Sequence, residues 1–280
     1  MSALSAITAK NPVLLLGCGK MGGAMLAGWL EQGLGNDAIY IVDPYLDPVR
    51  NTFSSLPEIA FNETIEKLGS ALAPSFIIMA VKPQMMDEAI TALKSMNVYE
   101  SVILSVAAGK TIQYFEDKLS ADQPIIRAMP NTPAAIGKGI TVCCANKLVT
   151  QDQKAICTTL LETVSTVEWI TDESLMDAVT ALSGSGPAYV FYMAEAMAAA
   201  GEAIGLPAEL SKKLARETVS GAGALLEASE ESTSRLRENV TSPGGTTAAA
   251  LDILMSDDGI VKIMRRAMQE AKARSKELAG

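Results

Sequence analysis

The chain has 280 residues, of which 49% are hydrophobic and 20% charged, so it can build one large domain or two ordinary ones. Its 23 basic and 32 acidic residues give a formal net charge of -9, and only 5% of residues are aromatic, which argues against a nucleic-acid-binding surface. Histidine is absent. This removes the commonest acid–base residue, the Ser–His pairing and most zinc sites, and we expect no metal.

In chain order, residues 1 to about 165 alternate short apolar runs with helical stretches. The runs are near-continuous in Val, Ile and Leu, as expected for strands buried on both faces, and they cover 13–16, 39–42, 76–81, 102–106, 125–129, 140–145 and 164–170. Helices are predicted between them at 20–33, 63–69, 84–95 and 151–163. This alternation predicts a doubly wound α/β domain of the Rossmann type, with a parallel sheet and helices on both sides.

After about residue 170 the strand-like runs stop. Helices are predicted in succession at 172–181, 186–204, 208–228, 231–239, 246–256 and 259–278. The 189–204 stretch is almost entirely apolar and small, and a helix that is apolar nearly all round is buried. Burial inside a homodimer would satisfy it better than one small domain. We therefore expect a Rossmann domain at 1–168 and an all-helical dimerisation and substrate domain at 169–280.

The cysteines and the N-terminus carry no sign of secretion. None of the four cysteines has the C-x-x-C spacing of a zinc or thioredoxin site, so we expect buried, reduced thiols at Cys18, Cys143, Cys144 and Cys157. The sequence predicts no signal peptide and no membrane span. The cytoplasm is the expected location.

The first apolar run leads directly into the pattern Gly17-x-Gly19-x-x-Gly22, and a helical pattern follows. The three glycines allow a tight turn, close approach of the backbone to a pyrophosphate, and close packing of helix on strand. The helix start then offers N–H groups to the phosphates. The pattern is weak alone, but its strand–turn–helix context predicts a dinucleotide site.

Asp43 follows the second run and lies 43 − 22 = 21 residues beyond the third glycine. An acid about 20 residues downstream binds a ribose 2′-OH, and its charge would repel the 2′-phosphate of NADP. Asp43 therefore favours NADH. Arg50 is close enough in sequence to keep NADPH possible, and Asp43-Pro44 could simply start a turn.

Three further segments follow predicted strands, where ligands of such sheets bind. Each could also be an ordinary loop, but their position at consecutive strand ends predicts a crevice. Lys82 could be a catalytic acid, a phosphate contact or a solvated charge, and small residues after the fourth run would admit a flat ring. The segments are Ala80-Val81-Lys82-Pro83-Gln84, Ser105-Val106-Ala107-Ala108-Gly109 and Arg127-Ala128-Met129-Pro130-Asn131-Thr132-Pro133.

Two glycine-rich turns precede helices in the second half of the chain. Backbone N–H groups and hydroxyls at a helix start make a carboxylate receptor, and we favour this function for the second turn. Alternatively, the turns serve only packing and capping, with Ser185 and Thr246 as caps. The turns are Leu182-Ser183-Gly184-Ser185-Gly186-Pro187-Ala188-Tyr189 and Asn239-Val240-Thr241-Ser242-Pro243-Gly244-Gly245-Thr246-Thr247.

Together these motifs resemble the pyrroline-5-carboxylate reductase family, which reduces a cyclic imine acid to proline. The resemblance spans about residues 13–256, and its two most specific stretches are the glycine-rich turns of the helical half. It implies a Rossmann domain followed by a helical domain that interlocks with a second subunit, giving a homodimer or a higher homo-oligomer with a site at the subunit interface. Its other matching stretches are the 17–22, 80–83, 107–109 and 129–133 segments.

The resemblance also implies roles for particular residues. The substrate carboxylate would be held by Ser242, Pro243, Gly244, Gly245, Thr246 and Thr247, with Thr247 as the catalytic hydroxyl near the ring nitrogen. NADPH or NADH would contact Gly17, Cys18, Gly19, Lys20, Met21, Gly22, Asp43, Asn62, Ala80, Val81, Lys82, Pro83, Val106, Ala107, Ala108 and Asn239. Many members carry a small polar residue and a nearby basic one where this chain has Asp43-Pro44, so the family's usual preference for NADPH does not carry over to this chain.

The implied reaction is hydride transfer from a reduced nicotinamide to the imine carbon, which requires no histidine. Two alternatives differ in class. A β-hydroxyacid dehydrogenase-like enzyme shares the layout but needs a catalytic lysine, for which Lys82 is too early in the chain. A non-catalytic nucleotide-binding regulator would have no use for the carboxylate receptor.

Overall fold

The computed structural model describes residues 3–68, 72–96 and 98–279. The chain divides into two compact units, which are described separately below. Unit 1 comprises residues 1–184 together with 272–280, and unit 2 comprises 185–271. The division falls after Gly184, later than the expected boundary after residue 168, and the end of the last helix belongs to unit 1.

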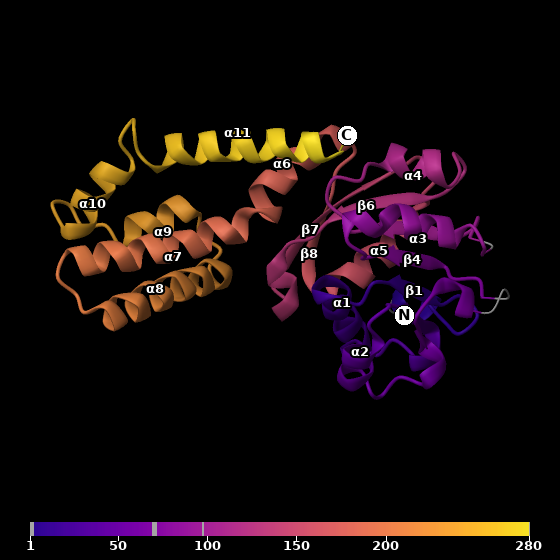
Figure 1. The fold of residues 1–280 in the computed structure, drawn as a ribbon. Coiled ribbons are helices and arrows are strands. Elements are labelled where there is room, and N and C mark those ends of the chain that lie inside the picture. The colour runs from indigo at the N-terminus through magenta and orange to yellow at the C-terminus, as the bar shows by residue number, and fades with distance from the viewer. Residues whose placement is uncertain (1–2, 69–71, 97, 280) are drawn as a thin grey trace. The chain divides into compact units, whose positions relative to one another are not determined.

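Unit 1 is built around one eight-stranded sheet with the order β3-β2-β1-β4-β5-β6-β7-β8. Several of its strands, among them β1, β4, β6, β7 and β8, are labelled in Figure 1. All seven predicted runs are strands, with bounds within two residues of those expected, and β3 was not predicted. The strands are β1 Val13–Leu16, β2 Ile39–Val42, β3 Phe61–Asn62, β4 Phe76–Met79, β5 Val102–Ser105, β6 Ile125–Met129, β7 Gly139–Ala145 and β8 Ser165–Trp169.

The sheet is mostly parallel, as predicted, with one exception. β7 runs antiparallel to β6, with Arg127 opposite Cys144, whereas the other neighbouring strands pair in parallel. A parallel connection needs a long crossover, usually a helix. Here the connection is only the short 3-10 helix η6 Thr132–Ile136, so the chain turns back antiparallel. The all-parallel alternation predicted from the sequence is therefore wrong at this pair.

Strand side chains alternate between two apolar layers. In β1, Val13 and Leu15 join the layer under α1, α2 and α5, while Leu14 and Leu16 join the layer under α3, α4 and α6. All four are at most 2% exposed, as expected of a parallel strand covered on both faces. The helices are α1 Lys20–Glu31, α2 Leu46–Thr52, α3 Met86–Leu93, α4 Ile112–Lys118, α5 Gln151–Glu162 and α6 Met176–Val179.

Short elements complete unit 1. They are the 3-10 helices η1 Ala3–Ala6, η2 Asn36–Ala38, η3 Glu58–Ala60, η4 Ile65–Lys67, η5 Pro83–Met85 and η7 Glu173–Leu175, and the π-helical turn η8 Thr180–Gly184. Of the helix predicted at 63–69, only η4 forms, and residue 69 lies outside the described residues. The helix predicted at 172–181 is instead divided among η7, α6 and η8.

Unit 2 is entirely helical in its regular structure, as predicted. Its helices are α7 Gly186–Ala203, α8 Ala208–Ala228, α9 Thr233–Asn239, α10 Thr246–Leu254 and most of α11 Ile260–Ala279. Helices α7 and α8 pack closely, and the hydroxyl of Ser211 donates to the Ala198 carbonyl at 2.6 Å. The approach requires a glycine at 201, since a Cβ there would lie 2.1 Å from the Ser211 hydroxyl oxygen. Among the described residues, no helix is both long enough and apolar enough to cross a membrane.

Candidate cofactor and substrate sites

The carboxyl ends of β1, β2 and β4 are tied together where the glycine turn, residues 17–22, leaves the sheet. The Gly17 N–H donates to the Val42 carbonyl at 2.8 Å, and the Ala80 N–H donates to the Leu16 carbonyl at 2.8 Å. The turn thus lies beside the 80–83 segment, as predicted for residues at neighbouring strand ends. Ligands of doubly wound sheets bind in this crevice.

At two positions of the turn only glycine fits, because another part of the backbone lies where a Cβ would be. Gly17 has φ +90°, which favours glycine, and a Cβ there would lie 2.8 Å from the Ala80 carbonyl oxygen. A Cβ on Gly22 would lie 2.1 Å from the Gly17 carbonyl oxygen, so any side chain would push helix and turn apart.

The middle glycine of the turn, Gly19, faces open space. A Cβ on Gly19 would meet no atom within 4 Å, and no side chain caps the start of α1 at Gly19. The first N–H groups of a helix have no partner within the helix. An uncapped helix start beside open space fits a diphosphate, and these residues can therefore hold a dinucleotide. Lys20 is exposed at the same helix start.

Asp43 anchors the glycine turn. One carboxylate oxygen accepts the Cys18 N–H at 2.7 Å, and the other accepts the Tyr45 N–H at 2.8 Å. Its own N–H donates to the Asn62 carbonyl at 3.1 Å. Asp43 therefore starts a local turn, as one reading of the sequence held, and also reaches the turn expected to bind the cofactor. Each oxygen keeps capacity for a further hydrogen bond.

The thiol of Cys18 is unreactive. Burial, with the nearby Asp43 carboxylate as the smaller cause, raises the pKa of Cys18 to about 12. The thiol consequently stays protonated at neutral pH and is not a nucleophile. All four cysteines are free thiols. Cys143, Cys144 and Cys157 are buried, as expected, whereas Cys18 is only partly buried. The described residues contain no group of three or more His, Cys, Asp or Glu that could hold a metal ion.

An acidic groove lies next to Asp43. The groove has a volume of about 660 Å³ and is walled by Leu16, Val42, Pro44 and Val81 together with residues of η4, η5 and α3. Its acidic lining residues are Glu63, Glu66, Asp87 and Glu88, and its lining includes no Lys or Arg. Hydrogen bonding to Lys67 lowers the pKa of the Glu63 carboxyl. This lining was not predicted, because its residues are scattered over the helices that follow the second and third strand regions.

Arg50, whose position in the sequence kept NADPH possible as the cofactor, is already paired with carboxylates of unit 1. Its guanidinium lies 2.6 Å from Glu58 and 3.9 Å from Asp47, and it stacks over the Phe61 ring at 5.8 Å. A phosphate would have to compete with both carboxylates for this cation.

The remaining unit 1 residues expected at the cofactor site follow β4 and β5. Val81 is half-buried and lines the groove, whereas Lys82 and Pro83 are exposed. After β5, Val106 donates its N–H to the Met79 carbonyl at 3.2 Å, which ties the 106–108 segment to β4. Ala108 is exposed. The structure therefore brings the predicted unit 1 residues to one edge of the sheet.

The residues expected at the substrate lie in unit 2. The 242–247 segment, here called the carboxylate loop, turns at Gly244, whose φ is +68°. The Gly245 N–H donates to the Ser242 carbonyl at 3.0 Å. Asn239, at the end of α9, donates its side-chain amide to Glu231 at 2.9 Å.

No side chain caps the start of α10. The residue at the cap position is Gly245, and Thr246 is the first helical residue, so the reading of Thr246 as a cap is wrong. Ser185 also makes no side-chain cap at α7. The N–H groups at the start of α10 are left to an outside acceptor. Thr247, half-buried in this chain, lies on the same first turn.

Comparisons with known proteins agree with this geometry. Residues 173–278 match the family model described as pyrroline-5-carboxylate reductase dimerisation. Residues 12–109 match the model described as NADP oxidoreductase coenzyme F420-dependent. The first match covers the helical half and the second the glycine turn.

Full-length relatives and solved structures extend the likeness to the whole chain. Pyrroline-5-carboxylate reductase of Haemophilus influenzae is 35% identical, with 95% of this chain and 97% of the relative covered. That of Mycobacterium tuberculosis is 36% identical, with 95% and 96% covered. The solved Coxiella burnetii enzyme superposes with a TM-score of 0.87 at 31% identity over 97% of this chain and 99% of that one.

A Plasmodium falciparum pyrroline carboxylate reductase solved with NADP bound superposes with a TM-score of 0.79 at 27% identity, over 98% of this chain and all of that one (100%). Likeness at this level of identity and coverage extends through both units, including the glycine turn and the carboxylate loop. The chain belongs to the pyrroline-5-carboxylate reductase family.

Proposed function

We propose that this protein reduces 1-pyrroline-5-carboxylate to L-proline, with a nicotinamide dinucleotide held by unit 1 and the substrate carboxylate held by the carboxylate loop of unit 2. As a member of its family it is an NAD(P)-dependent oxidoreductase. The observation that carries the substrate assignment is the uncapped start of α10, with Thr247 on its first turn.

The glycine turn supports the cofactor assignment. Open space at Gly19, the uncapped start of α1 and the enforced glycines at 17 and 22 suit a diphosphate. Ala80, Val81, Lys82 and Pro83 would flank it after β4, and Val106, Ala107 and Ala108 after β5. When bound, a reduced nicotinamide supplies the hydride.

The carboxylate loop suits an anionic imine acid. N–H groups at a helix start bind a carboxylate without adding a formal charge. Neutrality matters because hydride transfer discharges the iminium, so an anionic pocket would stabilise the ground state more than the transition state. The Thr247 hydroxyl would then hydrogen-bond the ring nitrogen.

The test compares 1-pyrroline-5-carboxylate with 1-pyrroline, the same ring without the carboxylate. We expect kcat/KM to fall by more than about 100-fold without the carboxylate, since the receptor then binds nothing. Equal kcat/KM for the two imines would contradict the role of the carboxylate loop.

The geometry further supports a preference for NADH, although the family includes a member solved with NADP. Asp43, the groove acids Glu66 and Glu88, and the ion pair of Arg50 with Glu58 all disfavour an added 2′-phosphate. The other two groove acids, Glu63 and Asp87, are paired with Lys67 and Lys118. We expect kcat/KM to be higher with NADH than with NADPH at saturating imine. A clear preference for NADPH would overturn this proposal and leave the reaction itself standing.

The match to a dimerisation model supports a homodimer formed through the helical half. Large apolar side chains on α7 are exposed in the single chain, with Phe191 63% and Tyr192 70% exposed. An apolar patch of this kind marks an association surface.

A further inference from the structure

A buried arginine of β6, next to β5 in the sheet, pairs with a partly exposed glutamate. Arg127 of β6 has a side chain only 5% exposed, and its guanidinium lies 2.8 Å from Glu173 at the start of η7. Burying a guanidinium is costly unless a carboxylate pairs with it. Glu173, whose side chain is 27% exposed, provides that carboxylate.

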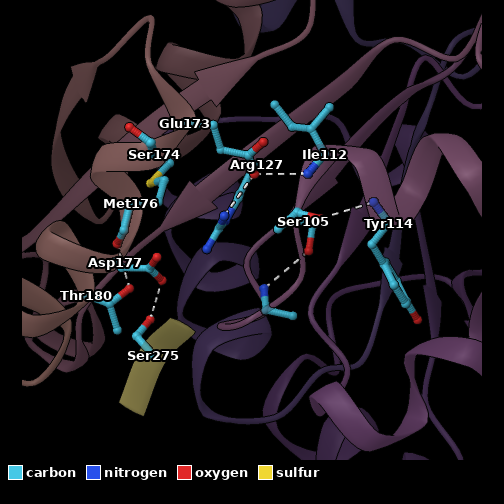
Figure 2. Close-up of polar contacts among 12 residues, drawn as sticks. Ser105, Ile112, Tyr114, Arg127, Glu173, Ser174, Met176, Asp177, Thr180 and Ser275 are labelled. Atoms are coloured by element: carbon cyan, nitrogen blue, oxygen red, sulfur yellow. Dashed lines mark hydrogen bonds and ion pairs between the residues drawn. The ribbon is translucent and has the colours of Figure 1, made fainter. Parts of the chain in front are cut away.

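Glu173 has a second partner, as Figure 2 shows. The oxygen that accepts from Arg127 also accepts the N–H of Ile112, the first residue of α4, at 2.9 Å. This N–H is one of those that a helix start leaves unpaired, and a carboxylate is favoured at that end of a helix. Thr111 caps the same helix by accepting the Tyr114 N–H at 3.1 Å. Glu173 therefore fixes the point where α4 begins.

The β5–α4 loop, residues 106–111, is consequently held at both ends. At its start, the Ala107 N–H donates to the Ser105 hydroxyl at 3.3 Å, and Ser105 pairs with Arg127 in the β5–β6 register. At its end lies the Ile112 bond to Glu173. In between, Gly109 has φ +73°, and a Cβ there would lie 3.0 Å from the Leu278 carbonyl oxygen of α11. A short loop with these anchors has little freedom to shift.

We propose that Glu173 is a positioning residue that sets the β5–α4 loop for the nicotinamide ring. This inference rests on the proposed function, because the resemblance is what assigns Val106, Ala107 and Ala108 to the cofactor. Glu173 acts through the Ile112 N–H and touches no reacting atom. A role limited to neutralising Arg127 would make the pair structural and would not affect the loop.

Variants that remove the buried cation separate the two roles. Arg127→Met replaces the guanidinium with an apolar chain and leaves Glu173 bonded to Ile112. Arg127→Met/Glu173→Ala removes the loop anchor without leaving a buried charge unpaired. Arg127→Met/Glu173→Gln restores an acceptor oxygen of the same reach.

Binding of NADH and of ADP-ribose, which lacks the nicotinamide, is measured for each variant by titration. We expect Arg127→Met/Glu173→Ala to bind NADH about tenfold more weakly than Arg127→Met, as for the loss of a hydrogen bond to a charged group. Its affinity for ADP-ribose should match that of Arg127→Met. The glutamine double variant should recover most of the NADH affinity and of kcat.

Thr141→Val is the matched control. It removes a buried hydrogen bond at 2.8 Å to Ser165 on β7 and β8, so it should lower the melting temperature without changing NADH affinity. Equal NADH affinity and kcat in Arg127→Met and Arg127→Met/Glu173→Ala would overturn the proposal, whatever their melting temperatures.

Glu173→Asp decides the question if the double variant does not fold. It keeps the charge for Arg127 but shortens the side chain by one methylene, and we expect weaker NADH binding with unchanged ADP-ribose binding. Unchanged NADH binding would again overturn the proposal. Failure of the proposed function is seen separately, as an inability of the wild-type protein to reduce the imine.

Discussion

The two units bury their apolar side chains to very different degrees. In unit 1, Trp29 of α1 and the strand residues of β4 are at most 1% exposed. In unit 2, the described residues of α7 include one buried position, Ala198, while Phe191, Tyr192 and Val190 are at least half exposed. Unit 1 therefore buries its apolar side chains within the chain, whereas unit 2 leaves an apolar surface on α7 exposed to solvent unless another protein surface packs on it.

An apolar run in the sequence therefore indicates burial in both units, but in unit 1 the covering residues belong to the same chain and in unit 2 they do not. A helix that is apolar nearly all round predicts burial but does not say in which molecule. For α7 the burial is not supplied within the chain, so the sequence signal points to a second copy. The predictions below test this division between a self-contained cofactor unit and a helical unit that depends on a partner.

The largest effect is expected from Phe191→Asp. A charge on the exposed face of α7 would oppose association through an apolar interface. We expect the mass measured by light scattering to fall to that of one chain and activity to fall by more than about 100-fold. Tyr99→Asp, at a unit 1 position that is 71% exposed, is the control and should remain associated and active. An associated Phe191→Asp protein would place the interface elsewhere.

The next effect is expected in unit 1 alone. In Gly22→Ala the new Cβ would lie 2.1 Å from the Gly17 carbonyl oxygen, so the glycine turn must move and NADH should bind about 100-fold more weakly. Gly23→Ala is the matched control, because its Cβ would meet the Cys18 carbonyl oxygen at an ordinary 3.6 Å. Equal NADH dissociation constants for these two variants would show that the turn does not hold the cofactor.

A smaller effect is expected in unit 2. Thr247→Ala removes the hydroxyl proposed to bind the ring nitrogen, and we expect kcat/KM for the imine to fall about tenfold. NADH affinity should not change, because unit 1 holds the cofactor. Thr247→Ser, which keeps the hydroxyl, should restore most of the activity. Unchanged turnover and KM in Thr247→Ala would remove this residue from the mechanism.

The smallest effect is expected for the choice of cofactor. Asp43→Asn keeps the size of the side chain and removes its charge, so the preference for NADH over NADPH should shrink about fivefold. The amide has one acceptor oxygen, so the bond from either the Cys18 N–H or the Tyr45 N–H is lost, and the resulting loss of affinity should be common to both cofactors. The measurement is the ratio of kcat/KM values for the two cofactors. A ratio identical to that of the wild type would show that the acidic groove, and not Asp43, sets the preference.

The helices and strands that were predictable from sequence have a regular apolar pattern or clear turn and cap residues at their ends. Strand β1 and helix α8 have the bounds expected from their apolar pattern. Helix α2 was missed because Asp-Pro pairs at 43–44 and 47–48 suggest turns, although a proline in the first helical turn is tolerated. Helix α4 was missed because seven residues give little period, although Thr111 before Ile112 is a cap signal.

The parts of the site that are formed by one continuous segment were predictable from sequence. The parts that are formed by residues far apart in the chain were not. The glycine turn and the carboxylate loop are contiguous motifs, so sequence spacing located them. The Arg127–Glu173 pair joins residues that are 46 positions apart, and the buried arginine in an apolar strand was the only sequence signal for it. Asp43 was found by spacing, but its bond to Cys18 required the fold.

The most direct test mixes the purified protein with 1-pyrroline-5-carboxylate and NADH and follows the near-ultraviolet absorbance of the reduced nicotinamide together with proline formation. The account predicts that absorbance falls only when the imine is present and that one proline appears for each NADH consumed. If neither NADH nor NADPH is consumed and no proline forms, the assignment of this chain as a reductase of that imine is contradicted.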